Sequence, residues 1–170
     1  MVDGSCRQLR RRRKLENKLP QGLWFEDYEP GLQVHTSGRT ITEADVANFA
    51  GISGDFNPLH MDETFSKSRM YGARVAHGLL VLSAASGLLM QTGILGSTVG
   101  AFREINQWKF LKPVYFGDTI TVLMEVLQTK AAPVLGGGLV KVSLAVHNQE
   151  DALLMKGVWT LFVLSKPSDK

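Results

Sequence analysis

Two of the four histidines, His60 and His77, stand beside turn residues or a glycine next to an apolar stretch, and Asp55 precedes His60 by five positions. Asp55 and His60 flank a four-residue segment that contains Pro58, which restricts the backbone. A carboxylate and an imidazole that share one water molecule form a general acid–base device. The imidazole suits this role because it ionises close to neutral pH. The spacing therefore allows a site that moves protons, built around Asp55 and His60, but does not by itself select it over a structural role.

Other interpretations of these residues stay open. A purely structural interpretation is that Asp55 forms an Asx turn and His60 caps the loop. A metal site is a third interpretation, with Asp55, His60, Asp62 and His77 as the ligands, but the chain has no HxxxH or HExxH pairing, so we expect no metal. The Gly-x-Ser-x-Gly elbow of serine hydrolases is also missing from the sequence.

A longer motif surrounds these residues. Residues 49–60 contain the order Gly-Asp-x-Asn-Pro-x-His, and Ser66 follows six residues later. This run resembles the signature of the MaoC-like, (R)-specific enoyl-CoA hydratase family, and residues 75–78 and 112–118 resemble two further landmarks of that family. The similarity covers roughly residues 30–164. It implies the hotdog fold, in which a curved antiparallel sheet wraps around a long central helix.

The resemblance also implies roles for individual residues. Asp55 and His60 would orient and activate one water for syn addition to a trans-2-enoyl thioester, which gives a (3R)-hydroxyacyl thioester. The backbone N–H of Gly78 would hold the thioester carbonyl, on which negative charge grows as water attacks C3. The other roles are supporting ones for Asn57 and Ser86, and contact with the phosphates of coenzyme A for Arg69 and Arg74.

The activity implied by the resemblance is that of a hydro-lyase, an enoyl-CoA hydratase or 3-hydroxyacyl-CoA dehydratase of acyl-CoA and fatty acid metabolism. We expect no cofactor beyond the coenzyme A of the substrate, a homodimer or higher homo-oligomer, and a cytoplasmic location. Two alternatives remain on this fold: an acyl-CoA thioesterase, and a non-catalytic acyl-thioester-binding subunit of a larger dehydratase. Acyl chain length, the CoA or acyl-carrier-protein handle, the direction and the pathway stay open.

Two helices are predicted near these residues. Thr42-x-x-Asp45 is typical of a capping box, and apolar residues then follow at helical spacing over 42–51. Residues 53–60 are expected to form a loop, with Phe56 and Leu59 anchored in the core. Residues 75–90 are so apolar that we expect a helix buried on nearly all sides, too short to span a membrane.

Strands are predicted over most of the rest of the chain. Alternating or continuous apolar residues indicate them at 32–36, 105–111, 119–128, 140–146 and 153–164. One apolar helix followed by a run of antiparallel strands predicts the α+β class, with a single domain over residues 21–166. A sheet of this kind leaves a face and edges to cover, and a homodimer is a common solution.

The charge is divided unevenly along the chain. Residues 1–18 hold seven basic and two acidic residues, whereas the remainder holds 12 basic and 14 acidic ones. We therefore expect residues 1–20 to form a disordered basic arm, and a nearly neutral body that does not bind nucleic acid. Cys6 is the only cysteine, which excludes an internal disulfide and favours a reducing compartment.

Overall fold

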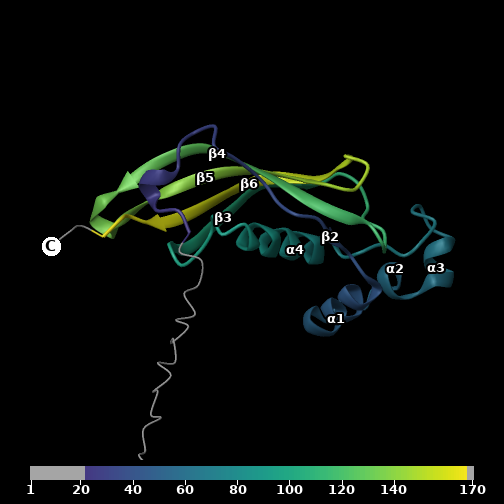
Figure 1. The fold of residues 1–170 in the computed structure, drawn as a ribbon. Helices are drawn as coiled ribbons and strands as arrows, with labels where there is room; N and C mark the ends of the chain where they lie inside the picture. Colours follow the sequence, from purple (N-terminus) through teal and green to yellow (C-terminus); the bar gives the residue numbers. More distant parts are fainter. Residues whose placement is uncertain (1–21, 168–170) are drawn as a thin grey trace, which may run out of the picture.

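The computed structural model describes residues 22–167, and the predicted basic arm at residues 1–20 lies outside them. A long antiparallel sheet forms one layer, and helix α4 (Gly78–Gln91) lies along one face of it (Figure 1). Helices α1, α2 and α3, at residues 43–67, gather at one end of the sheet, at the right of Figure 1. The prediction of the α+β class is confirmed, and the two predicted layers are those observed.

The elements follow one another in an order close to that predicted. The helices are η1 (Phe25–Asp27), α1 (Glu43–Ser53), α2 (Pro58–Met61), α3 (Glu63–Lys67), α4 (Gly78–Gln91) and η2 (Pro133–Leu135). The strands are β1 (Gln33–His35), β2 (Arg39–Thr40), β3 (Val99–Phe110), β4 (Thr119–Ala132), β5 (Gly137–His147) and β6 (Leu153–Leu164).

The sheet has the strand order β1-β4-β5-β6-β3, with β2 paired to β4, and all these pairs are antiparallel. Side chains on β4 and β5 alternate between buried and partly exposed, because successive residues of a strand point to opposite faces. The buried set packs against α4 and forms the core, with Val81 and Leu89 of α4 fully buried. The sheet therefore shields one side of α4, and β3 lies at its edge.

Helix α1 begins as the sequence predicts. The Asp45 backbone N–H donates to the Thr42 hydroxyl at 3.2 Å, and the Asp45 carboxylate accepts from the Thr42 N–H at 2.9 Å. The hydrogen bond from the Thr42 backbone is the largest of the effects that hold the pKa of Asp45 below its ordinary value. Gly54 ends the helix in the left-handed region, with φ of 76°, which glycine adopts without strain.

Two expectations about the following segment are wrong. Pro58 begins the short helix α2 rather than keeping the chain in a loop, since a proline at the first helical position loses no hydrogen bond. Phe56 is 61% exposed and does not anchor the segment in the core. A short helix thus places His60 one turn after Asn57.

Helix α4 also differs from the prediction for residues 75–90. It begins at Gly78, after an extended N-cap residue, His77, whose φ is −61° and ψ 132°. It is not buried on nearly all sides, because Leu79 is 60% and Met90 48% exposed. Within the described part of the chain, no helix combines the length and the apolar composition that crossing a membrane requires.

Candidate active site

Asp55 and His60 lie on the connection between α1 and α3. Asn57 caps α2, because its side-chain oxygen accepts from the Leu59 N–H at 2.9 Å. The buried Ser66 hydroxyl lies 3.1 Å from the carbonyl oxygen of Pro58 and 3.0 Å from that of Leu59, which ties α2 to α3. These contacts fix the short helix on which His60 stands.

The His60 ring is held by a backbone carbonyl. Its Nδ1 lies 2.7 Å from the oxygen of Val75, and a carbonyl oxygen can only accept, so Nδ1 carries the proton. The neutral ring therefore presents an unprotonated Nε2, which can accept a proton from water. The Val75 N–H returns a long hydrogen bond to the Leu59 carbonyl at 3.4 Å, which links the same two segments again.

His77 lies beside both of the other groups. Its Nε2 is 2.9 Å from the backbone carbonyl oxygen of Asp55 and 4.0 Å from the Asp55 carboxylate. Its ring centroid lies 3.8 Å from that of His60, and the two planes are inclined by 32°. His77 is 2% exposed, whereas the Asp55 side chain is about half exposed. The structure thus brings together the three acid–base residues.

These three residues could also be considered as metal ligands, since one nitrogen or oxygen of each lies within 4.8 Å of the others. Two ligands of a tetrahedral zinc, each about 2.0–2.1 Å from the metal, would be about 3.4 Å apart. The 4.0 Å between His77 Nε2 and the Asp55 carboxylate is wider than this, and Nε2 already donates to a carbonyl. The arrangement favours hydrogen bonding and proton transfer over metal binding.

A pocket of about 650 Å³ adjoins this cluster. His60 and Gly78 lie on its wall, and Lys112 is the one charged residue among the others that the structure describes there. The remaining lining residues are apolar or aromatic: Leu59, Met70, Tyr71, Val75, Ala76, Leu79, Phe110, Leu111, Pro113, Val114 and Met155. Gly78 is the first residue of α4, where the backbone N–H groups have no partner within the helix and the helix dipole is positive. The pocket therefore offers an apolar cavity with a base and a backbone donor on its wall.

The close packing of Phe110 explains why residue 78 is a glycine. A Cβ atom added to Gly78 would lie 2.7 Å from the Phe110 ring, so a side chain there would displace the ring. Phe110 ends β3 and Lys112 follows it, more than 30 residues after Gly78, and neither of them was assigned to the site from the sequence, although Lys112 begins the family landmark at 112–118. Apolar composition alone does not separate a pocket residue from an ordinary strand residue.

The two predicted arginines occupy different environments. The Arg74 guanidinium lies 2.6 Å from Glu43 and 3.0 Å from Glu63, whereas that of Arg69 lies over the Phe65 ring at 4.4 Å. The hydrogen bond to Glu43 raises the pKa of Arg74, and the hydrogen bond from Arg74 lowers the pKa of Glu63. Two carboxylates therefore already neutralise Arg74, which makes Arg69 the freer of the two.

Ser86 does not join the pocket. It is half-buried on α4, eight residues after Gly78, which corresponds to about 12 Å along a helix axis. It is not among the described residues that line the pocket. The structure therefore separates Ser86 from the cluster that the sequence analysis grouped it with.

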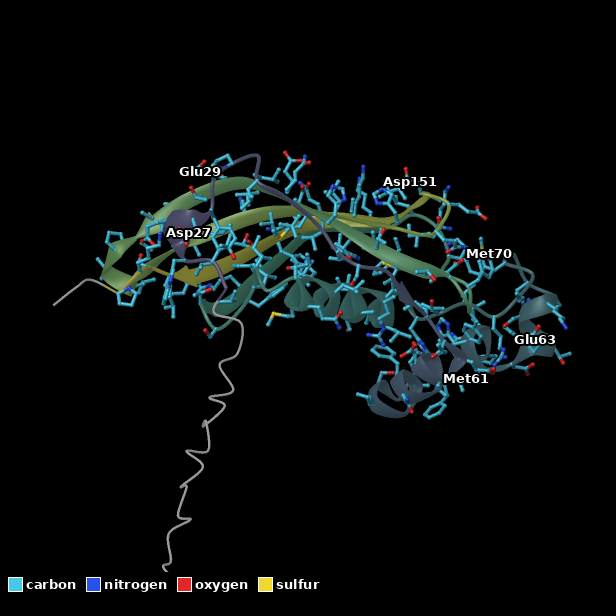
Figure 2. All side chains as sticks on the ribbon, in the orientation of Figure 1. Asp27, Glu29, Met61, Glu63, Met70 and Asp151 are labelled. Atoms are coloured by element: carbon cyan, nitrogen blue, oxygen red, sulfur yellow. The ribbon has the colours of Figure 1, made fainter. Side chains whose placement is uncertain are left out.

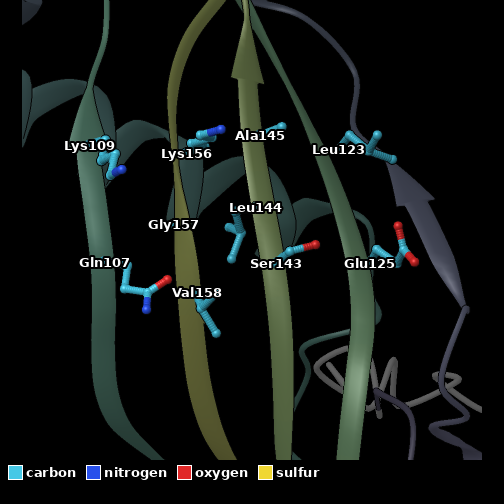
Figure 3. Close-up of a pocket in the computed structure, with 10 residues that line it drawn as sticks. All are labelled: Gln107, Lys109, Leu123, Glu125, Ser143, Leu144, Ala145, Lys156, Gly157 and Val158. Atoms are coloured by element: carbon cyan, nitrogen blue, oxygen red, sulfur yellow. The ribbon is translucent and has the colours of Figure 1, made fainter.

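The region of the site lies at one end of the molecule. Figure 2 shows Met61, Glu63 and Met70 at the end where the short helices gather, and Asp27 at the opposite end of the sheet. A second, smaller pocket of about 420 Å³ lies over the middle strands and is lined by Lys109, Glu125 and Lys156 among others (Figure 3). Its described lining residues include no histidine, whereas His60 lies on the wall of the first pocket.

This combination defines a class of protein: an antiparallel sheet over a central helix, with an acid–base pair beside the start of that helix. A solved structure from Mycobacterium tuberculosis described as a double hotdog fold superposes with a TM-score of 0.77. It is 21% identical, and the match covers 88% of this chain and 46% of that one. The predicted hotdog fold is confirmed.

The chain belongs to the MaoC-like family, whose model, described as a MaoC like domain, matches residues 27–151. Protein MaoC of Klebsiella aerogenes is 41% identical over 103 residues, which are 61% of this chain and 30% of that protein. The (R)-specific enoyl-CoA hydratase of Rhodospirillum rubrum is 37% identical over 103 residues, 61% of this chain and 69% of that enzyme. The predicted family is confirmed, and the second of these relatives is named for a hydratase activity, which falls in the predicted hydro-lyase class.

Proposed function

We propose that this protein catalyses the reversible syn hydration of a trans-2-enoyl-CoA to a (3R)-3-hydroxyacyl-CoA. The observation that carries the proposal is the placement of His60 and Gly78 on one pocket, with the Asp55 carboxylate in the same cluster as His60. The name of the Rhodospirillum rubrum relative, an (R)-specific enoyl-CoA hydratase, supports the same reaction. Coenzyme A enters as part of the substrate, and the proposal includes no other cofactor.

The geometry suggests how the proton moves. His60 Nε2 accepts one proton from the water as its oxygen attacks C3, and the Asp55 carboxylate accepts a hydrogen bond from the same water. The Gly78 N–H, at the positive end of α4, stabilises the enolate oxygen. A proton from His60 then reaches C2 on the face that water attacked, so that one water adds in total and the addition is syn.

The phosphates of coenzyme A need cations near the pocket mouth. Lys112 lines the pocket, and Arg69 precedes Met70 and Tyr71, which also line it. We assign the phosphate contacts to these two residues first, because Arg74 is already paired with Glu43 and Glu63. The apolar lining of the pocket fits an acyl chain.

The proposed active form is a homodimer. Strand β3 lies at the sheet edge, and within residues 22–167 it pairs with β6 alone. Phe102 and Ile105 on β3 are almost half exposed. On α4, Met90 is almost half exposed and Leu79 is more than half exposed. A second copy of the chain would bury these apolar side chains and satisfy the unpaired backbone groups of the edge.

The experiment that tests the proposed function follows the ultraviolet absorbance of the conjugated enoyl thioester after the protein is added. We expect this absorbance to fall with substrates of some chain lengths, and the product to have the R configuration at C3. Release of free thiol would instead indicate a thioesterase. Binding of acyl-CoA without turnover at any chain length would contradict the proposal and favour a non-catalytic subunit.

Replacing Gly78 by alanine should lower kcat/KM by at least about tenfold, because the new Cβ displaces the Phe110 ring within the pocket. Phe110 is 53% exposed, so its ring can move and the protein should still fold. Steady-state hydration kinetics measure the effect. The double variant Gly78→Ala/Phe110→Ala should recover most of the activity relative to Phe110→Ala alone.

Gly51→Ala is the matched control, because Gly51 is helical and a Cβ there meets nothing within 4 Å. It should leave the kinetics unchanged. If Gly78→Ala were as active as Gly51→Ala, the predicted effect of the Phe110 ring on the reaction would be wrong.

A further inference from the structure

We infer that His77 is the positioning residue of this site, which holds the Asp55 segment, the His60 ring and the start of α4 in one arrangement. The inference rests on the proposed function, because it concerns how the proposed acid–base pair is held. His77 is 2% exposed and belongs to neither the water-binding pair nor the pocket lining. It therefore acts through its neighbours rather than on the substrate.

The first link joins His77 to the segment that includes Asp55. The Asp55 carbonyl can only accept, so His77 Nε2 carries a proton and donates it across 2.9 Å. The other hydrogen bonds found at Asp55 in the described part of the chain are local, to Ser53 and Asn57, two residues away on either side. The bond from His77 is thus the one that ties Asp55 to α4, 22 residues along the chain.

The second link is between rings. The His77 ring lies between Phe49 of α1, at 5.1 Å between centroids, and His60 of α2, at 3.8 Å. The His60 ring is therefore supported on one face by His77 and held at its edge by the Val75 carbonyl. These contacts limit the directions in which His60 Nε2 can point.

The third link is through the backbone. His77 is the N-cap residue of α4, and its carbonyl accepts the first helical hydrogen bond, from the Val81 N–H at 3.2 Å. The next N–H along the chain is that of Gly78, the proposed donor to the thioester carbonyl. One residue thus sets the relative positions of the carboxylate, the imidazole and the backbone donor.

The Nδ1 atom of His77 indicates that this residue does more than fill space in the core. Its Nδ1 is buried and has no hydrogen-bond partner among residues 22–167, which costs free energy that a phenylalanine ring would avoid. A site chosen only for stability would favour the apolar ring. The imidazole is explained if the donor at Nε2 is needed, since phenylalanine cannot hold the Asp55 carbonyl.

The test separates the ring from the donor with three variants. His77→Phe keeps a ring without the donor, His77→Gln keeps a donor near the position of Nε2 without the ring, and His77→Asn is a shorter amide that does not reach. For enoyl-CoA hydration, we expect His77→Phe and His77→Asn to lower kcat about 100-fold. KM should change by less than about threefold, because the pocket lining is untouched.

His77→Gln should stay within about tenfold of the wild-type kcat. The melting temperature of His77→Phe should remain within about 3 °C of the wild type, because one lost hydrogen bond is offset by removing a buried atom without a partner. Wild-type kcat in His77→Phe would overturn the inference, and so would equal losses in His77→Phe and His77→Gln. A loss of kcat that follows a loss of folding would indicate a purely structural role and would also overturn it.

Asp55→Asn, measured in parallel, distinguishes the two failures. An inactive Asp55→Asn beside a fully active His77→Phe would contradict the role of His77 and leave the proposed function standing. If the wild type hydrates none of the substrates, imidazole ¹⁵N spectra still decide the inference. They should show His77 protonated at Nε2 and His60 at Nδ1, with the His60 signals shifted in His77→Phe. The opposite tautomer at His77 would overturn the link to Asp55.

Discussion

Asp55→Asn should lower kcat for enoyl-CoA hydration by about 10³-fold, within the range by which a positioned acid–base group accelerates a reaction. Asparagine has the size of aspartate but replaces one acceptor oxygen with an NH₂ donor, which cannot accept a hydrogen bond from the water. The variant should fold normally, because the side chain is about half exposed and His77 binds the backbone carbonyl of residue 55. The loss is therefore one of chemistry rather than of structure.

The measurement is the initial rate of absorbance loss at saturating enoyl-CoA, together with the dissociation constant for a non-reacting acyl-CoA. Binding should change little, since Asp55 is not among the residues lining the pocket. Asp62→Asn is the control, because Asp62 caps α3 through its side-chain oxygen and asparagine can do the same. Equal activity in Asp55→Asn and the wild type would contradict the proposed acid–base pair.

Trp159→Ala should lower the free energy of unfolding by about 3–5 kcal/mol, as expected when a large buried aromatic side chain is removed. Trp159 on β6 is 1% exposed. Its ring contacts Phe102 edge to face at 4.9 Å and stacks with Trp108 at 6.1 Å between centroids. Both neighbours belong to β3, so the cavity would loosen the attachment of the edge strand to the sheet.

Urea denaturation of the two proteins measures this loss, and Trp159→Phe is the matched variant. Phenylalanine keeps a ring in the site and removes Nε1, which is buried without a hydrogen-bond partner among the described residues. We therefore expect Trp159→Phe to cost less than about half as much as Trp159→Ala. Equal losses in the two variants would show that ring packing is not the source of the stability.

Features that depend on neighbours in the sequence were predictable. The helix at 42–51 was predicted because the two residues of its capping box, Thr42 and Asp45, are only three positions apart, and β6 was found at residues 153–164 as predicted. The pair Asp55 and His60 was singled out because both residues belong to one short motif, residues 49–60, that resembles the family signature. The sequence is enough to predict a feature when the residues that interact in it are only a few positions apart.

Features that depend on distant segments were not predictable. The Val75 carbonyl lies 15 residues from His60 and fixes its tautomer, and Phe110 reaches Gly78 only because β3 returns beside α4. The acids that pair with Arg74 come from α1 and α3. The exposed Phe56 was mispredicted because apolar character alone does not say which side of a short segment faces the core.

Both imidazoles of the site are oriented by peptide oxygens, those of Val75 and Asp55, rather than by carboxylate side chains. A peptide oxygen does not take up a proton in the pH range of an enzyme assay, so a lower pH protonates neither of these two acceptors. An amino-acid substitution does not remove this acceptor either, because every residue has the same backbone carbonyl. A substitution at position 75 or 55 therefore leaves the hydrogen bond to the ring in place, provided the backbone keeps its path, and the side chain of residue 55 is constrained by its proposed role in acid–base chemistry rather than by this hydrogen bond.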